Sequence, residues 1–200
     1  TNNLANYWVH NGFVTINKEK MSKSLGNIIT ISDAVKKYSG QVVRLSLLSA
    51  HYSQPLDWND ELLMNQSNII DKWYNLYAEP NDDDASTIIQ TLFDDLNTPG
   101  FIAKIHELYN EALKGDGKSK NLFNIACRLI GLFDLDKTEW NNFKKSKHKI
   151  SEETIIKKIN ERIKARKNED FKLADEIRDE LLNNGIVIED KKGKTSWKYK

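Results

Sequence analysis

The stretch Lys20-Met21-Ser22-Lys23-Ser24-Leu25-Gly26-Asn27 is the most informative part of this 200-residue chain. It follows a β-prone run at residues 13–16 and a polar turn at residues 17–20, which predicts a hairpin or a strand that leads into a loop. Gly26 allows a positive φ or a close backbone approach. Two Lys ammonium groups beside two hydroxyls suit a polyphosphate, because both kinds of group donate hydrogen bonds to phosphate oxygens. The alternative is an ordinary surface loop rich in Lys and Ser.

The chain beyond this loop is predicted to be mostly helical. Residues 28–31 are β-prone, and Ser32 is expected to cap a helix that ends at Lys37. Periodicity, caps and breakers predict further helices at residues 41–49, 59–77, 85–93, from Asn97 or Thr98 to about 113, and at 122–133. This middle part is predicted to be an antiparallel helical bundle.

The last fifty residues predict a small α+β domain. Two helices, at residues 151–167 and 171–182, precede the terminator Asn183-Asn184-Gly185, and strands at 186–188 and 195–198 complete a hairpin. Residues 144–149 are basic and lack large apolar side chains, which favours a linker. The chain is therefore predicted to be mainly α, with a loop-bearing segment (1–56), a helical bundle (57–146) and an α+β domain (150–200).

The composition is that of a globular protein, with 39% hydrophobic residues and a net charge of +1. No stretch approaches the roughly 18 apolar residues that a membrane helix needs, and the first ten residues do not resemble a signal peptide. We therefore expect a cytoplasmic protein without a membrane segment. The single cysteine, Cys127, excludes an internal disulfide and a Cys-rich zinc site, and we expect it in the core.

Charge is distributed unevenly along the chain. Residues 51–100 are strongly acidic, with Lys72 as their one basic residue, whereas basic side chains outnumber acidic ones between residues 137 and 172. A basic stretch in a nearly neutral chain is a candidate surface for phosphates of a nucleic acid. The alternative is a solvated helix face.

The run at residues 20–27 matches the second signature of class I aminoacyl-tRNA synthetases, and the whole chain resembles cysteinyl-tRNA synthetases. The end of the chain is the most specific part, and it argues against the methionine, isoleucine and valine relatives. The matching stretches are Tyr7-Trp8-Val9-His10-Asn11-Gly12, Gln41-Val42-Val43-Arg44, His51-Tyr52-Ser53-Gln54-Pro55-Leu56-Asp57, Asp94-Asp95-Leu96-Asn97-Thr98-Pro99, 174–181, 185–190 and Thr195-Ser196-Trp197.

The resemblance implies a cysteine–tRNA ligase that joins cysteine to tRNA(Cys) through cysteinyl adenylate. Lys23 is then the expected ATP-binding residue, with Lys20 as its catalytic partner, and Met21, Ser22 and Ser24 complete the ATP loop. The residues at positions that read the anticodon in the family are Arg166, Phe171, Asp175, Asp190, Ser196 and Trp197. The expected partners are tRNA(Cys), ATP with Mg²⁺ and cysteine, and we expect a monomer. The parent enzyme is expected to hold zinc, whose ligands are not in this chain.

The chemistry of those six positions suits base recognition. Arg forks to a base edge or stacks on a base, aromatic faces contribute roughly 1–3 kcal/mol per stacked base, and carboxylates accept from base amino groups. The family often has Trp at Phe171 and Thr at Ser196. The alternative is structural: Phe171 and Trp197 pin the hairpin to the helices, Asp175 is a solvated charge and Asp190 begins a turn.

The sequence contains no H-I-G-H-like motif and no βαβ series, which a complete class I synthetase needs. We therefore expect a fragment of a larger enzyme that is inactive alone. Three alternatives stay open: a non-catalytic tRNA-binding module derived from a synthetase, a cysteine ligase of thiol biosynthesis, and a helical interaction protein. For His51 a packing or hydrogen-bonding role is favoured over catalysis.

Overall fold

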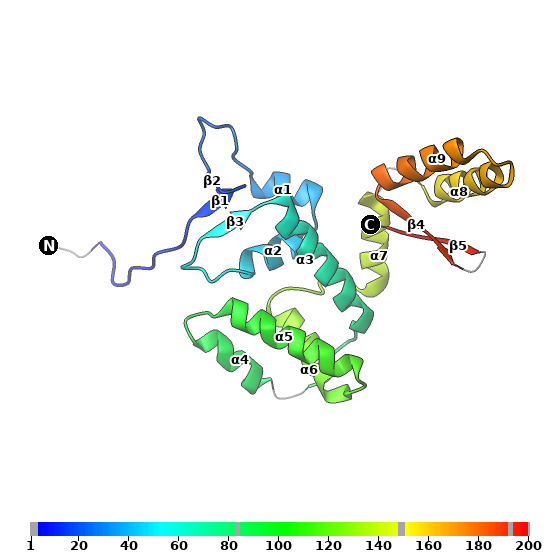
Figure 1. Cartoon of the computed structure of the whole chain (residues 1–200). Helices are drawn as coiled ribbons and strands as arrows, with labels where there is room; N and C mark the ends of the chain where they lie inside the picture. The colour runs from blue at the N-terminus through cyan, green and yellow to red at the C-terminus, as the bar shows by residue number, and fades with distance from the viewer. Residues whose placement is uncertain (1–3, 83–84, 148–150, 192–193, 200) are drawn as a thin grey trace. The chain divides into compact units, whose positions relative to one another are not determined.

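The computed structural model describes residues 4–82, 85–147, 151–191 and 194–199. The chain divides into two compact units, residues 1–136 and 137–200. Helices predominate (Figure 1), which confirms the mainly α fold predicted from the sequence. Within the ranges described, no helix combines the length and apolar character that a membrane crossing requires.

The first unit starts with a small sheet and continues as helices. In chain order its elements are β1 (Val14–Ile16), β2 (Glu19–Lys20), α1 (Ile31–Lys37), α2 (Gly40–Leu48), β3 (Leu56–Trp58), α3 (Asp60–Trp73), the 3₁₀ turn η1 (Tyr74–Leu76), α4 (Ser86–Phe93), α5 (Thr98–Leu113) and α6 (Gly117–Leu129).

The sheet has the strand order β2–β1–β3. The predicted hairpin is the antiparallel pair β1–β2, and its turn residues Asn17 and Lys18 have φ values of 51° and 67°. β3 runs parallel to β1 with Val14 opposite Leu56. The sequence did not predict β3, because three residues after Pro55 are too few to show an alternating pattern.

The start of α1 differs from the prediction. Residues 28–30 form no strand, and the N-cap is Thr30, whose hydroxyl accepts a hydrogen bond from the Asp33 N–H at 3.1 Å. Ser32 therefore lies inside the helix. Both residues are good caps, and the extended backbone of Thr30 (φ −82°, ψ 157°) decides between them.

The other predicted helices of this unit are present, with shifted ends. Asn97 caps α5, as expected, with Pro99 in its first turn. α6 begins five residues earlier than predicted, because Asp116 caps it by accepting from the Lys118 N–H at 3.1 Å. It ends at Leu129, and Gly131 follows with a φ of 73°.

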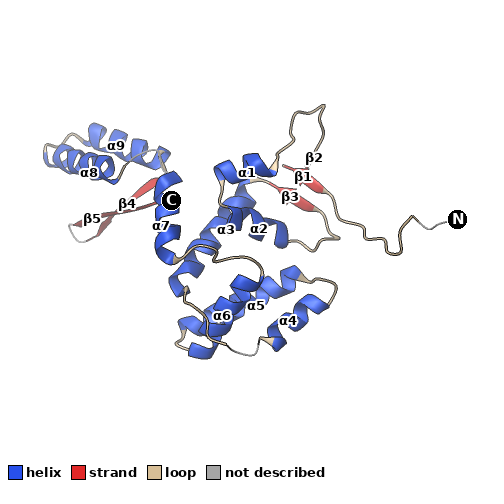
Figure 2. Ribbon diagram, turned by 180° about the vertical axis from the view of Figure 1, so that it is seen from behind, coloured by secondary structure: helices blue, strands red, loops and turns tan. Residues whose placement is uncertain are grey.

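Buried side chains from α2, α3, α5 and α6 form the core of the first unit. Figure 2 shows the ribbons of these helices. Trp73 is its centre, 1% exposed, with its ring edge-on to Phe123 at 5.8 Å between centroids. Cys127 is fully buried, as predicted, and burial raises the pKa of its thiol.

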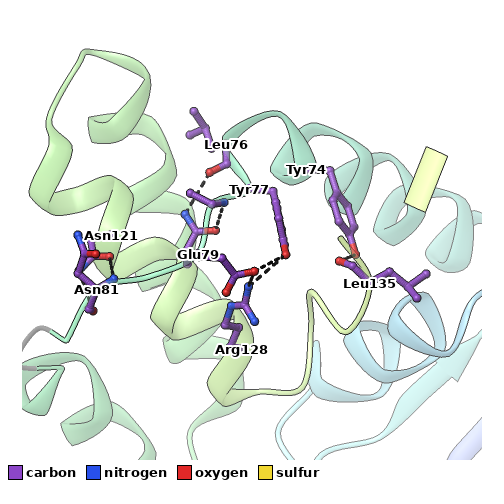
Figure 3. Close-up of polar contacts among 10 residues, drawn as sticks. Tyr74, Leu76, Tyr77, Glu79, Asn81, Asn121, Arg128 and Leu135 are labelled. Atoms are coloured by element: carbon purple, nitrogen blue, oxygen red, sulfur yellow. Dashed lines mark hydrogen bonds and ion pairs between the residues drawn. The ribbon is translucent and has the colours of Figure 1, made fainter. Parts of the chain in front are cut away.

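A set of polar contacts fastens the segment after α3 to α6 (Figure 3). The Asn124 side chain accepts from the Ala78 N–H at 2.9 Å and donates to the Leu76 carbonyl at 3.0 Å. Further along, Arg128 pairs with Glu79 at 2.8 Å. Because Asn124 is fully buried, its bonds satisfy backbone groups that would otherwise lack partners.

The second unit contains α7 (Lys137–Lys147), α8 (Glu152–Lys167), α9 (Phe171–Asn183), β4 (Ile186–Lys191) and β5 (Lys194–Tyr199). The two predicted helices and the hairpin are thus present, and Gly185 has the positive φ (77°) expected of a helix terminator. Among the described residues of this unit, the core is formed by the buried aliphatic side chains Ile155, Ile159, Ile177, Leu181 and Ile186.

The predicted linker at residues 144–149 is wrong in its first part. Residues 144–147 continue α7, and residues 148–149 lie outside the described ranges. Lys is a good helix former, so a lack of large apolar residues did not end the helix. The division into three segments stays a prediction.

Candidate functional site

The base of the Lys20–Asn27 loop is held by close backbone packing. The Gly12 N–H donates to the Tyr52 carbonyl at 2.8 Å, and the Leu56 N–H donates to the Phe13 carbonyl at 2.9 Å. A Cβ on Gly12 would lie only 2.1 Å from the Gln54 carbonyl oxygen. Only glycine fits this contact, so the backbone that leads to the loop packs directly against the backbone of residues 52–56.

Asp57 braces the hairpin that carries the loop. Its carboxylate accepts from the Thr15 hydroxyl at 2.7 Å, from the Lys18 N–H at 2.6 Å and from the Asn59 amide at 2.9 Å. These bonds, led by that of Thr15, lower the pKa of Asp57. The ionised carboxylate therefore fixes the β1–β2 turn from the neighbouring strand.

The loop itself is closed by Asn27. The Asn27 side chain accepts from the Ser22 N–H at 2.9 Å and donates to the Lys20 carbonyl at 3.2 Å. Gly26 has a φ of 64°, and its N–H donates to the Lys23 carbonyl at 3.2 Å. The backbone is thereby shaped without use of the lysine side chains.

The functional groups of the loop lie on its outside. Lys20, Lys23 and Ser24 are exposed, and the Ser22 and Ser24 hydroxyls are 3.2 Å apart. Met21 and Lys20 border a cavity of about 330 Å³ that is also lined by residues 13–15. Two exposed ammonium groups beside two hydroxyls have the chemistry that suits a polyphosphate.

The loop fits phosphate better than it fits a metal ion. Residues 20–27 contain no carboxylate, and in the described part of the chain no group of three His, Cys, Asp or Glu side chains could hold a metal. Oxygen ligands from Asp or Glu are what Mg²⁺ takes from proteins. A Mg²⁺ ion at this loop would therefore have to be carried by the phosphates.

His51 has the structural role that the sequence favoured. Its Nε2 lies 2.7 Å from the Asp95 carbonyl oxygen, and its Nδ1 lies 2.7 Å from the Ser53 hydroxyl. The Tyr52 hydroxyl donates to the Asp95 carboxylate at 2.7 Å. The stretches 51–57 and 94–99, both quoted above for the resemblance, thus lie against each other.

In the second unit, three of the predicted anticodon residues lie at the end of α8 or near the start of α9, the two helices that lie side by side in Figure 1. Arg166 is in the last turn of α8, and Phe171 is the first residue of α9. Glu169, with a φ of 61°, makes the turn tight. Phe171 is 61% exposed, and Asp175, one turn further along α9, is also exposed. An exposed aromatic face can stack on a base, and so can an exposed guanidinium group.

Asp190 has a different environment from Asp175. Its Oδ2 accepts from Arg162 and from Arg166, each at 2.9 Å, and its Oδ1 accepts from the Thr195 hydroxyl at 2.7 Å. The Arg162 guanidinium and the Thr195 hydroxyl lower the pKa of Asp190 to about 2. Asp190 is thus ionised and already paired.

Ser196 and Trp197 lie on β5. Ser196 is exposed and donates from its hydroxyl to the Glu189 carbonyl at 3.2 Å. Trp197 is partly buried, stands opposite Ile188 in the hairpin and packs against the core of the unit. The structural alternative for Trp197 therefore has direct support from its contacts, while its role in base stacking stays a prediction.

Three residues that shape these sites were missed. Arg162 precedes Arg166 by one helical turn, and that spacing could have indicated that both reach one carboxylate. Asn27 was part of the quoted signature but was given no role. Asp57 could not have been found, because its role depends on the unpredicted strand β3.

Comparison with known proteins finds matches to the segments that carry the two candidate sites. Residues 1–68 match the model of the class I (C) tRNA synthetase catalytic domain, and residues 159–197 match that of the cysteinyl-tRNA ligase anticodon binding domain. The chain is 52% identical over 199 residues to a cysteine–tRNA ligase of Pelagibacter ubique, which covers 98% of this chain and 44% of that protein. A cysteine–tRNA ligase of Rickettsia bellii is 42% identical over 205 residues, with 97% and 44% covered.

The chain spans less than half the length of these relatives. Among solved structures, 60% of the chain overlays on 19% of a LeuRS–tRNA complex from Agrobacterium radiobacter with a TM-score of 0.46 and 21% identity, a likeness too low to define a shared fold. The sequence relatives and both domain models instead agree with each other. Over 97–98% of its length the chain is thus homologous to cysteine–tRNA ligases, and it matches models of both their catalytic and their anticodon-binding domains.

Proposed function

We propose that this chain serves the ATP-dependent attachment of cysteine to tRNA(Cys), with the 20–27 loop acting on ATP and the second unit reading the anticodon. The observation that carries the proposal is the pairing, in one chain, of an exposed Lys/Ser loop on a braced hairpin with an exposed Arg166–Phe171 end. A tRNA-binding module without catalysis has no use for the first of these.

In the adenylation step the cysteine carboxylate attacks the α-phosphorus, and pyrophosphate leaves. Negative charge grows on the leaving oxygens, so Lys23 and Lys20 accelerate the step to the extent that they meet those oxygens better in the transition state. The Ser22 and Ser24 hydroxyls donate to the same phosphates. The exposure of Lys20, Lys23 and Ser24 leaves these side chains able to close over the nucleotide.

In anticodon recognition Arg166 offers N–H donors to a base edge, and Phe171 offers a stacking face. Asp175 is an acceptor for a base amino group, of which the GCA anticodon has one on each base. Basic residues of α8 add attraction to the phosphates, which falls with salt. The Mg²⁺ that accompanies ATP and the zinc of the parent enzyme would be bound outside the groups described above, and we expect the protein in the cytoplasm.

The test is a fluorescence titration of the 200-residue chain with tRNA(Cys) and with the same tRNA carrying an altered anticodon. We expect weak, salt-sensitive binding to both and tighter binding to the GCA form. Equal affinity for the two would remove the recognition part of the proposal. The chain alone is expected to give no cysteine-dependent ATP–pyrophosphate exchange, since it spans only 44% of the length of the Pelagibacter ubique relative. An exchange signal would contradict this expectation.

A further inference from the structure

The oxygens of Asp190 are already occupied. Oδ2 accepts from two guanidinium groups, and Oδ1 accepts from Thr195 and lies 3.4 Å from Nη1 of Arg162. A carboxylate oxygen has about two lone-pair directions. A base amino group could therefore bind Asp190 only by displacing one of these donors.

Arg162 and Arg166 differ in their exposure. The Arg162 side chain is 7% exposed, whereas that of Arg166 is 51% exposed. Arg162 presents both terminal nitrogens to Asp190, and its Nε is buried without a hydrogen-bond partner among the described residues. Among the described residues, Asp190 is its one ion-pair partner, so the buried cation holds the carboxylate in place.

Arg166 is held by only one of its nitrogens. Nη1 donates to Asp190, which leaves the remaining N–H groups of an exposed guanidinium without a hydrogen bond to any other described residue. A planar Arg that is fixed at one corner loses less rotational freedom when it binds a base edge. Arg162 is thus a buried cation, Asp190 is a carboxylate that bridges the two arginines, and Arg166 is a cation that is exposed to solvent.

We infer that Asp190 acts through Arg166 and touches no base itself, and that buried Arg162 is the positioning residue that holds this pair ready. The inference rests on the proposed anticodon recognition and adds to it. It assigns Arg166 as the group that reads a base, Asp190 as its anchor and Arg162 as the support of that anchor.

The test measures anticodon preference, defined as the ratio of the Kd for an altered anticodon to the Kd for GCA, with the full 200-residue chain. Arg166→Ala is expected to lower this ratio about tenfold, since a lost base contact is worth on the order of a factor of ten or more. Arg162→Met is expected to lower it about threefold or more, because Asp190 then lacks its fixed partner. The double variant should equal Arg166→Ala alone.

Lys158→Met is the matched control. It removes a cation from the same helix that pairs with Glu180 of α9 and has no contact with Asp190. It is expected to weaken binding to both tRNAs by the same factor and to leave the ratio unchanged. A role of Arg162 limited to stability or to general phosphate attraction would give the Lys158→Met result.

Two results would overturn the inference while anticodon recognition stands. One is a folded Arg162→Met variant with the full ratio; the other is a double variant that loses clearly more than Arg166→Ala. If Arg162→Met does not fold, Thr195→Val, which removes the hydroxyl donor to Asp190, takes its place. The ratio is then measured for Thr195→Val alone and for Thr195→Val combined with Arg166→Ala, with the same expected results. An unaltered chain with a ratio of one overturns both the inference and the proposed recognition.

Discussion

The signature loop and the tip of the β4–β5 hairpin use charged residues in opposite ways. In the loop, Lys20 and Lys23 are exposed, and the backbone is shaped by Asn27 and Asp57 instead. At the hairpin, Asp190 pairs with two Arg side chains before any ligand is present.

The difference matches the chemistry that each region is proposed to serve. A lysine that must approach the negative charge growing on a leaving group benefits from a mobile side chain. An ion pair with a protein carboxylate would oppose that approach. A guanidinium that reads a fixed base edge gains from being oriented in advance. The exposed lysines of the loop therefore suit phosphate chemistry, and the anchored Arg166 suits base recognition.

The largest effect is expected at the loop. In the complete enzyme, Lys23→Ala should lower the rate of ATP–pyrophosphate exchange about 10²- to 10³-fold, the usual loss for one group that stabilises transition-state charge. Lys18→Ala is the control, since it removes an exposed lysine from the same hairpin outside the signature. Equal losses in the two variants would mean that general positive charge, rather than the signature position, matters.

The rigid base of the loop can be broken without touching its charges. Gly12→Ala should lower the free energy of unfolding by about 2–3 kcal/mol, because the new Cβ meets backbone rather than a flexible side chain. Urea denaturation followed by Trp fluorescence measures it. Gly40→Ala is the control: it has no atom within 4 Å of the new Cβ and lies in α2, so it should be neutral or slightly stabilising. A stable Gly12→Ala variant would contradict the close backbone packing.

The sequence was most informative where local chemistry decides structure. Caps such as Asn97 and terminators such as Gly185 act within a few residues, so the helices of both units were predicted with their ends shifted by a few positions, with the exception of α7, which was missed. Strand β3 depends on a partner more than forty residues away and has three residues, so no local pattern indicates it. The same holds for Asp57, whose contacts with Thr15 and Lys18 exist only once β3 has paired with β1.

For the candidate site, the residue types were predicted but the pairings were not. The family resemblance pointed to Arg166 and Asp190 separately. That they bind each other, with Arg162 behind them, follows from the hairpin folding back onto α8, which is a tertiary event. Asp190 and Asp175 look alike in the sequence, and only the structure separates a paired carboxylate from an exposed one.

A smaller effect is expected on acidification of the hairpin region. The pKa of Asp190 is about 2, below its ordinary value of 3.8, so its ion pairs stabilise the fold above about pH 4, and this contribution is lost as the pH falls through 2. Since the Asp190 side chain is 40% exposed, solvent screening reduces the contribution to about 1 kcal/mol. Denaturation at pH 5 and at pH 2 should show this loss in the unaltered chain and a smaller one in Asp190→Asn. Asp179→Asn, an exposed carboxylate on α9, should keep the full pH dependence.

The smallest effect is expected at Ser196, whose side chain is both exposed, like the loop lysines, and already hydrogen-bonded, like Asp190. Its hydroxyl is exposed, yet it already donates to the Glu189 carbonyl at 3.2 Å. Ser196→Thr keeps the hydroxyl and adds a β-branch, which strands favour, so stability should rise by no more than about 0.5 kcal/mol with unchanged anticodon preference. Ser196→Ala should have a similarly small effect on stability but should lower the preference if the hydroxyl contacts a base. An unchanged preference in Ser196→Ala would instead show that this hydroxyl serves only the hairpin, and recognition would then rest on Arg166, Phe171 and Asp175.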